Sequence, residues 1–430
     1  MKWSILHSKK HVFALFFLYA TTLIAQENKE VKGLIIDNAT SKNLSLVSIQ
    51  IENSNIGTVS NLEGEFTLKI PDDYINNRLV ITLIGYDDKF ISISELSSDT
   101  NKIALTPSSI NLSEVNITAF KNAEDLVRAL FDKKKENYSN ERAIMTSFYR
   151  ETIKKRKKNV SLSEAVVNLY KQPYSKSHRD FMKPLRSRKS TDYTKLDTIA
   201  LKLQGGPYNT LYIDVMKYPE YIFVPESLSN YDFSFGKPTE INGNGVYTVH
   251  FKQKENIYDP LYYGTLYISS SSFALVRAQY NLNVANKSEA SKLFVKRKPT
   301  DVNVQPEAIS YQVDYRNKDN TWYYGYGKAS LTFRVKKRRK LFSSVYSLTC
   351  EMAVTDWKAS SSPEEWSKAG NISKSIILVD EASGFSDPEF WGDYNVIEPE
   401  KSIESAIRKI QKKLDKMSQT SGKGAFGSKP

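Results

Sequence analysis

Apolar residues stand at every second position in several short runs between residues 31 and 94. The runs are Val47, Ile49 and Ile51, then Phe66, Leu68 and Ile70, and then Ile91 with Ile93. Because successive side chains of a strand point to opposite faces, this period predicts half-buried strands. Turn-forming Asp, Asn, Gly and Pro residues separate the runs. Short strands at this spacing predict a small antiparallel β-sandwich over residues 26–108.

A helical period replaces the alternation between residues 123 and 137. Leu126, Val127 and Leu130 fall on one face of a helix, and charged residues occupy the opposite face. Asn122 precedes this run and is suited to cap its first turn. We therefore expect residues 109–140 to form a linker strand and helix, whose apolar stripe packs on the β-region that follows.

Residues 141–400 are rich in tyrosine and have the pattern of successive strands. Examples are MTSFYRETI, GVYTVHFKQ and WYYGYGKASLTFRVK. Residues 241–247 and 269–272 carry the Gly, Asn and Ser residues of hairpin turns. Strands without intervening helical periods predict one large antiparallel, curved β-sheet rather than β-α-β units.

The chain after the predicted sheet contains an aromatic segment and a second helical pattern. Phe390, Trp391 and Tyr394 lie shortly before residues 401–417, where apolar residues recur at helical spacing. We expect the aromatic residues to clamp this C-terminal helix onto the sheet. Residues 418–430 are rich in Gly, Ser and Lys, which predicts a disordered tail.

The first 25 residues have the layout of a secretory signal peptide. Lys2, Lys9 and Lys10 supply the positive region, residues 12–24 are largely apolar, and Ala25 offers a small residue at the cleavage site. The apolar run is too short for a helix across a bilayer core of about 30 Å. We expect an exported protein of the periplasm or outer membrane, without a transmembrane helix after signal cleavage. An uncleaved anchor is the alternative.

The predicted sandwich carries a set of motifs with fixed glycines. They are V-x-G-x-I-x-D at residues 31–37, V-x-I-x-I at 47–51, GTVSNLEGEFTLKIP at 57–71 and I-G-Y at 84–86. In this order they resemble the carboxypeptidase regulatory-like domain. That transthyretin-like sandwich lies beside the catalytic domain of some metallocarboxypeptidases and at the N-terminus of many TonB-dependent outer-membrane receptors. The resemblance implies an envelope protein whose sandwich contacts a partner, and LSEVNITA at residues 112–119 resembles the segment that often follows this domain.

Basic residues exceed acidic ones, 61 against 48, for a formal net charge of +13. They cluster at residues 133–135, 154–158, 186–189, 296–298 and 336–340. We expect most clusters to be solvated strand faces, because charge runs usually are. Attraction to an anionic lipid or a glycan is the alternative, and an envelope protein is the third class of partner. The sequence shows no nucleic-acid-binding module, so we expect no nucleic-acid partner.

The expected mature chain lacks the common catalytic and metal-binding motifs. Its histidines are His178 and His250, and the chain has no HExxH motif or carboxypeptidase-type zinc spacing. It also has no G-x-S-x-G elbow and no P-loop. We therefore assign no catalytic, metal-binding or cofactor-binding residue, and we expect no cofactor and no enzyme activity. A carboxylate pair that only the fold assembles leaves no motif, so a hydrolase stays as an alternative.

The single cysteine and the paired glycines have structural interpretations. Cys350 has no partner for an intramolecular disulfide, and we expect it to be a buried, small apolar side chain. Gly205-Gly206 and Gly325-x-Gly327 are interpreted as turn or close-packing glycines.

Three functions follow from these patterns. The favoured one is a non-catalytic binding or scaffold protein of the cell envelope, whose sandwich contacts a partner. The first alternative is a periplasmic carrier of a lipid or apolar ligand in a half-barrel sheet, which an apolar cavity under the linker helix would favour. The second is a hydrolase with two carboxylates about 5–10 Å apart in a cleft. The identity of the ligand and the oligomeric state stay open.

Overall fold

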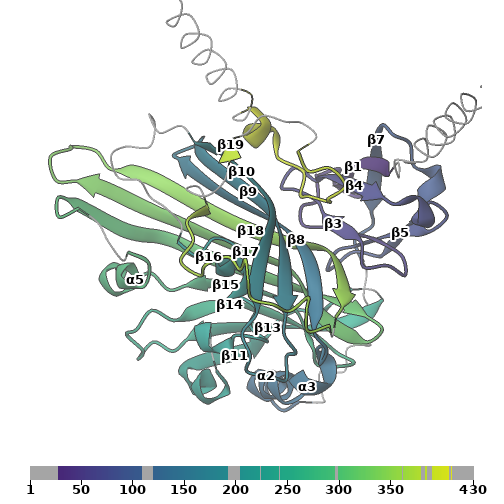
Figure 1. Ribbon diagram of the computed structural model, residues 1–430. Coiled ribbons are helices and arrows are strands. Elements are labelled where there is room, and N and C mark those ends of the chain that lie inside the picture. The colour runs from purple at the N-terminus through teal and green to yellow at the C-terminus, as the bar shows by residue number, and fades with distance from the viewer. Residues whose placement is uncertain are drawn as a thin grey trace, which may run out of the picture.

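The computed structural model describes residues 28–108, 120–191, 204–222, 224–241, 243–295, 299–360, 362–378, 383–384, 390–405 and 408. The predicted signal peptide at 1–25, the segment 112–119, the basic cluster 296–298 and the tail at 418–430 lie outside these residues. The described chain is mainly β, with two small N-terminal sheets, one large sheet and short helices (Figure 1).

The predicted N-terminal sandwich consists of the two small sheets. One has the strand order β4-β1-β7 and the other β3-β2-β5-β6. The strands are β1 Lys29–Asp37, β2 Ser48–Ile51, β3 Gly57–Val59, β4 Glu65–Ile70, β5 Arg78–Thr82, β6 Lys89–Ser92 and β7 Thr100–Leu105. Two 3-10 turns, η1 Asp72–Tyr74 and η2 Ile93–Glu95, follow β4 and β6.

The apolar residues that recur at every second position fill the space between these two sheets. Ile49 and Ile51 of β2 and Leu68 of β4 are fully buried and belong to one apolar cluster. Ser48 and Gln50 alternate with them and lie on the opposite face of β2, toward the large sheet. The alternation therefore predicted the register of these strands correctly.

Two features of the sandwich differ from the expectation. β1 and β7 pair in parallel, whereas the other neighbouring strands of the sandwich are antiparallel. After β6 of the other sheet, the chain returns to the sheet of β1, and β7 runs beside β1 in the same direction. In addition, β6 ends at Ser92, and Ile93 begins a 3-10 turn. This turn places the Ile93 side chain in the core. The Asn77 backbone carbonyl accepts the Ile93 backbone N–H at 3.0 Å.

The predicted linker helix forms as two helices, α2 (Ala123–Asp132) and α3 (Lys134–Asn137). Asn122 caps α2, because its side chain accepts the N–H of Asp125 at 2.8 Å. The apolar stripe of α2 is buried in the core of the large-sheet domain, as its spacing predicted. None of the described helices is both long and apolar enough to cross a membrane.

The large sheet has the order β11-β13-β14-β15-β16-β17-β18-β8-β9-β10-β19, with β12 paired to β13. Its strands are β8 Ala143–Lys155, β9 Lys158–Lys171, β10 Phe181–Thr191, β11 Tyr231–Phe235, β12 Thr239–Ile241, β13 Asn244–Gln253, β14 Tyr262–Ser269, β15 Leu275–Leu282, β16 Val302–Lys318, β17 Thr321–Lys337, β18 Ser344–Ala359 and β19 Ser383–Gly384. The short helices of this domain are α4 Tyr208–Leu211, η4 Pro219–Tyr221, η5 Pro225–Asn230 and α5 Lys287–Phe294. Neighbouring strands are antiparallel apart from β10 and β19, and the strands that flank each predicted hairpin turn pair with each other.

Different segments of the chain pack on the two faces of the large sheet. On the helix face, Tyr149 and Ile153 of β8 belong to the same apolar core as buried residues of α2, α4 and the turns after α4. On the sandwich face, Phe148 of β8 packs with Val59 of the sandwich and with Trp391 of the C-terminal segment. Successive residues of β8 thus serve two separate cores, because side chains alternate across a strand.

Trp391 of the predicted aromatic clamp packs on the sandwich face of the large sheet, and residues 406–407 and 409–417 of the predicted helix lie outside the described residues. The rings of Trp391 and Phe148 lie 5.5 Å apart in an edge-to-face contact. Residues 401–405 are helical, and Ile403 is buried against Leu162 of β9. We call residues 390–401 the tether segment, because they also bind the sandwich, as described below.

We expect Ile49→Asp to unfold the sandwich. The change removes roughly 1.5–3 kcal/mol of apolar burial and leaves a charge in the core. Scanning calorimetry of the full chain measures the transition. Gln50→Asp is the matched control, because its side chain lies on the opposite face of the same strand. Equal melting curves for wild type and Ile49→Asp would contradict the register.

Candidate functional site

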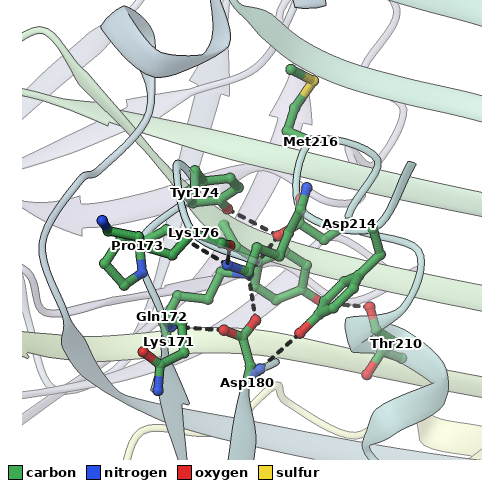
Figure 2. A network of polar contacts seen from close by, with 12 residues as sticks. Lys171, Gln172, Pro173, Tyr174, Lys176, Asp180, Thr210, Asp214 and Met216 are labelled. Atoms are coloured by element: carbon green, nitrogen blue, oxygen red, sulfur yellow. Dashed lines mark hydrogen bonds and ion pairs between the residues drawn. The ribbon is translucent and has the colours of Figure 1, made fainter. Parts of the chain in front are cut away.

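A lysine and two aspartates form a buried ionic group beneath the helix face (Figure 2). Lys171 is the last residue of β9, Asp180 precedes β10, and Asp214 follows α4. Lys171 Nζ lies 2.8 Å from Asp180 Oδ2 and 2.7 Å from Asp214 Oδ2. The side chains are at most 3% exposed, so water does not screen these contacts.

Tyrosines complete the hydrogen bonds of this group. Tyr174 donates to Asp214 Oδ2 at 2.9 Å, and Tyr315 of β16 donates to Asp214 Oδ1 at 2.8 Å. The Tyr174 ring also lies 4.7 Å from Lys171 Nζ in a cation–π contact. The Asp180 carboxylate accepts the backbone N–H of Gln172 at 2.7 Å. Both carboxylate oxygens of each aspartate accept a hydrogen bond, and these bonds offset the cost of burying the charges.

The electrostatics of the group favour a permanently charged lysine. Burial alone would lower the pKa of Lys171, but attraction to Asp180 and Asp214 outweighs burial and raises the pKa. Burial and the Asp214 charge raise the pKa of Tyr174 well above its usual value, so this phenol stays protonated. Lys171 and Tyr174 therefore both keep their protons near neutral pH.

This arrangement fixes structure. Lys171, Asp180 and Asp214 tie the β9–β10 connection, the segment after α4 and the sheet together. Neither aspartate lines any of the three cavities described below. No sequence pattern points to this group beyond a lysine at the end of an apolar strand.

The sandwich face holds a second buried ionic group. Arg150 Nε donates to Glu164 Oε1 at 2.7 Å, and Arg188 Nε donates to Glu164 Oε2 at 2.9 Å. Arg150 Nη2 also donates to the carbonyl of Ile397 in the tether segment at 2.7 Å. Arg188 belongs to the basic cluster 186–189, so the expectation of a solvated face is wrong for this residue. Its guanidinium stacks on the Trp391 ring at 4.6 Å.

The tether segment continues from this group to the sandwich. Asn395 binds the edge of β4 twice: its Oδ1 accepts the Lys69 N–H at 2.7 Å, and its Nδ2 donates to the Lys69 carbonyl at 3.1 Å. Thr58 of β3 donates to the Val396 carbonyl at 3.1 Å. The tether segment therefore joins the sandwich to the sandwich face of the large sheet.

A cleft of about 290 Å³ lies between the sandwich and the large sheet. The outer face of the sheet β3-β2-β5-β6 forms one wall, and the ends of β16 and β17 form the other. Asn55 of the sandwich bridges the two walls. Its Nδ2 donates to the Trp357 carbonyl at 2.5 Å, and Lys318 Nζ donates to its Oδ1 at 2.6 Å. We treat this cleft as the candidate binding site.

Two other cavities lie on the large sheet. One of about 350 Å³ next to α3 is lined mainly by polar residues, including Asn137, Ser271 and Asn320. The other, of about 160 Å³, is lined by Tyr262, Tyr280 and other apolar or aromatic residues on the helix face. The cavity beside the linker helix is thus polar, unlike the apolar cavity that would favour a lipid carrier.

His250 and Cys350, which the sequence analysis considered, lie in different surroundings. The His250 ring contacts Thr265 Oγ1 at 3.0 Å on an exposed strand face. In the described ranges, no three His, Cys, Asp or Glu side chains are grouped to hold a metal ion. Cys350 is fully buried, as predicted, and burial raises the pKa of its thiol to about 12.

We expect Lys171→Met to destabilise the protein by about 3–5 kcal/mol, because it leaves two buried aspartates without their cation. Urea unfolding followed by tryptophan fluorescence measures the loss. Lys358→Met is the matched control, since Lys358 pairs with Glu365 at the surface with its side chain 65% exposed, and such pairs contribute about 0–1 kcal/mol. Equal losses for the two variants would refute the structural role of Lys171.

We also expect a pH-dependent effect of Glu151, whose buried carboxyl accepts the Tyr149 hydroxyl at 2.9 Å. Burial raises the pKa of Glu151 to about 7, although the bond from Tyr149 opposes this. An unfolded Glu titrates near 4.3, so the folded chain holds one more proton between about pH 4.3 and pH 7. The free energy of unfolding therefore falls as pH rises through this window. Glu151→Gln removes this contribution, and thermal melts at pH 5 and pH 8 should show a smaller loss than wild type; an identical loss would contradict the assignment.

Comparisons with known proteins identify the first domain. Among solved structures, a DUF1329 family protein from Desulfovibrio piger aligns with 58% of this chain and 97% of its own, at 10% identity and a TM-score of 0.23. No curated protein sequence matches the chain. Residues 31–117 match the model of the CarboxypepD_reg-like domain, which confirms the resemblance of the sandwich motifs.

Proposed function

We propose that the protein is an exported, non-catalytic binding protein of the cell envelope that attaches to an anionic lipid surface. The attachment surface consists of residues 154–158 and 336–342, which we call the basic tips. They form the ends of two neighbouring hairpins, β8–β9 and β17–β18. The observation that carries the proposal is a pair of exposed apolar residues within these basic loops.

The two basic tips lie side by side in the large sheet. Lys155 of β8 pairs with Tyr346 of β18, and the Arg156 N–H donates to the Val345 carbonyl at 2.8 Å. The sequences of the tips are KKRKK and KKRRKLF, without an acidic residue. Adjacent basic loops of this kind are attracted to an anionic bilayer by about 1 kcal/mol for each basic residue near its surface.

Leu341 and Phe342 lie in the second tip and are 90% and 80% exposed. Water contact of two large apolar side chains costs free energy, and burial of each in acyl chains would recover roughly 1.5–3 kcal/mol. Apolar side chains ringed by Lys and Arg are typical of proteins that bind the membrane interface. The same pair has no evident use on a hairpin end that faces only water.

The basic tips and the candidate cleft lie at opposite ends of β17. β17 begins beside the cleft at Thr321 and reaches the tips at Lys337. Its 17 residues span roughly 55 Å at about 3.3 Å per residue. Attachment through the tips would therefore hold the sandwich and the cleft away from the lipid surface, where the sandwich is able to contact an envelope partner.

The buried carboxylates support binding over hydrolysis. A two-carboxylate hydrolase needs both groups in a cleft that admits its substrate. Asp180 and Asp214 are instead held by one lysine, and Glu164 is held by two arginines. The tyrosine-lined cavity of about 160 Å³ is also smaller than typical ligand pockets of about 300–1,000 Å³, which gives the lipid-carrier alternative less support.

Sedimentation with lipid vesicles tests the proposal. We expect wild type to bind vesicles that contain phosphatidylglycerol at low salt, and to bind phosphatidylcholine vesicles weakly. Combined Lys336→Gln, Arg338→Gln and Arg339→Gln changes should weaken binding on the order of a hundredfold, from about 1 kcal/mol per charge. Leu341→Ser with Phe342→Ser should weaken it at least tenfold, including at salt concentrations that screen charge.

The matched control changes three exposed lysines elsewhere, Lys42, Lys102 and Lys252, to Gln. This variant has the same net charge as the tip variant and should bind nearly as wild type does. Absence of wild-type binding at low salt would refute lipid attachment. Equal losses in the two charge variants would refute the role of the tips.

A further inference from the structure

Three hairpin turns and the end of α3 meet at the cavity of about 350 Å³. The turns join β12 to β13, β14 to β15 and β16 to β17. They lie at one end of the large sheet, because the strands between them are antiparallel. Asn137, the last residue of α3, donates from Nδ2 to the Ser272 carbonyl in the β14–β15 turn at 2.7 Å. A rigid sheet thus holds several loops around one space, which is a common layout for binding sites.

The β16–β17 connection is a tight two-residue turn. Lys318 pairs with Thr321, and the two residues between them, Asp319 and Asn320, have φ angles of 51° and 58°. A two-residue hairpin turn of this type requires left-handed backbone at both positions, and Asp and Asn adopt it more readily than most residues. The turn therefore fixes the position at which Asn320 lines the cavity.

The described lining of this cavity contains no charged side chain, although 25% of the residues in the chain are charged. Its polar residues are all asparagine or serine. An ion in such a cavity would lose water without meeting an opposite charge, which is costly. Amide and hydroxyl side chains both donate and accept hydrogen bonds. The lining therefore suits an uncharged ligand whose own groups donate and accept, as the hydroxyl groups of a sugar do.

The polar groups of the lining include several that a ligand can reach. Ser271, Asn317 and Asn320 are exposed. The side chains of Asn317 and Asn320 form no hydrogen bond with other residues in the part of the chain that the structure describes. Their amides are therefore open to a ligand from solvent.

Apolar side chains supply the rest of the lining. Trp322, Val246 and Val276 are among them, and all three are buried in the core of the large-sheet domain. A sugar ring carries C–H groups on its faces and hydroxyl groups at its edge, so it needs both kinds of surface. The volume of about 350 Å³ falls within the range of about 300–1,000 Å³ that ligand pockets have, and it suffices for a sugar ring.

We propose that this cavity binds a neutral saccharide. The asparagine and serine side chains bond to its hydroxyl groups, and Trp322 packs against the apolar face of one ring. The cavity lies near the start of β17, whereas the basic tips lie at its other end. The site rests on observations that the lipid attachment does not use, and either proposal can fail without the other.

A glycan array tests the site on the wild-type full chain. The array carries neutral oligosaccharides of glucose, galactose, mannose, rhamnose and N-acetylglucosamine, together with anionic oligosaccharides. We expect at least one neutral oligosaccharide to bind at physiological salt, where the charge of the basic clusters is largely screened. Binding of no neutral oligosaccharide, or of anionic ones alone, would overturn the proposal.

Isothermal titration calorimetry then locates the site, with the neutral oligosaccharide that the array captures best as the probe. Asn320→Gly combined with Ser271→Ala should lower its affinity about tenfold or more, because two hydrogen-bonding groups are lost. Glycine keeps the left-handed backbone at position 320, and thermal melts check that this variant stays folded.

Asn303→Ala is the matched control, because Asn303 is an exposed asparagine at the other end of β16, opposite Lys336. It should bind the probe as wild type does. Unchanged affinity in the double variant, or equal losses in the double variant and the control, would also overturn the assignment.

Discussion

The pairing of β8 with β18 determines how the whole chain is arranged. The two strands are antiparallel over their length, from Ala143 opposite Ala359 to Lys155 opposite Tyr346. This ladder joins the first strand of the large sheet to its last long strand, across some two hundred residues. As a result α2, which precedes β8, lies under the helix face, and the tether segment, which follows β18, lies over the sandwich face. The β8–β9 hairpin likewise comes to lie beside the β17–β18 hairpin.

Buried charge in this protein joins segments that are far apart in the sequence. Lys171 connects the strand that it ends with Asp214, and Arg150 connects β8 with the backbone of the tether segment. Replacing such groups with apolar residues is often neutral or favourable for stability, so their value lies in specifying one arrangement. The fully bonded acceptors around Lys171 fit that role. Arg316 differs, because its buried Nη2 atom has no hydrogen-bond partner in the described part of the chain.

The large sheet carries different chemistry at its two ends. At one end of β17 and β18, their basic loop with its two exposed apolar side chains lies beside the basic loop of β8 and β9, and the other end meets the sandwich at a cleft. Long antiparallel strands make this separation rigid, since each strand is fixed by a neighbour on both sides. The CarboxypepD_reg-like sandwich therefore forms one wall of the cleft in addition to being a domain of its own.

The sequence by itself determined the elements whose signals are local. Alternation in β2 and β4 identified the sandwich strands, the cap and stripe of α2 identified the linker helix, and Gly325 was interpreted as a turn or close-packing glycine. Only the tertiary structure decided what those elements bring together. The Lys171 group, the cleft and the neighbouring tips depend on strand order in the large sheet, and strand order comes from long-range pairing that leaves no periodic pattern in the sequence. A lysine at a strand end or an arginine on a polar face has the same local pattern whether water or a buried partner meets it.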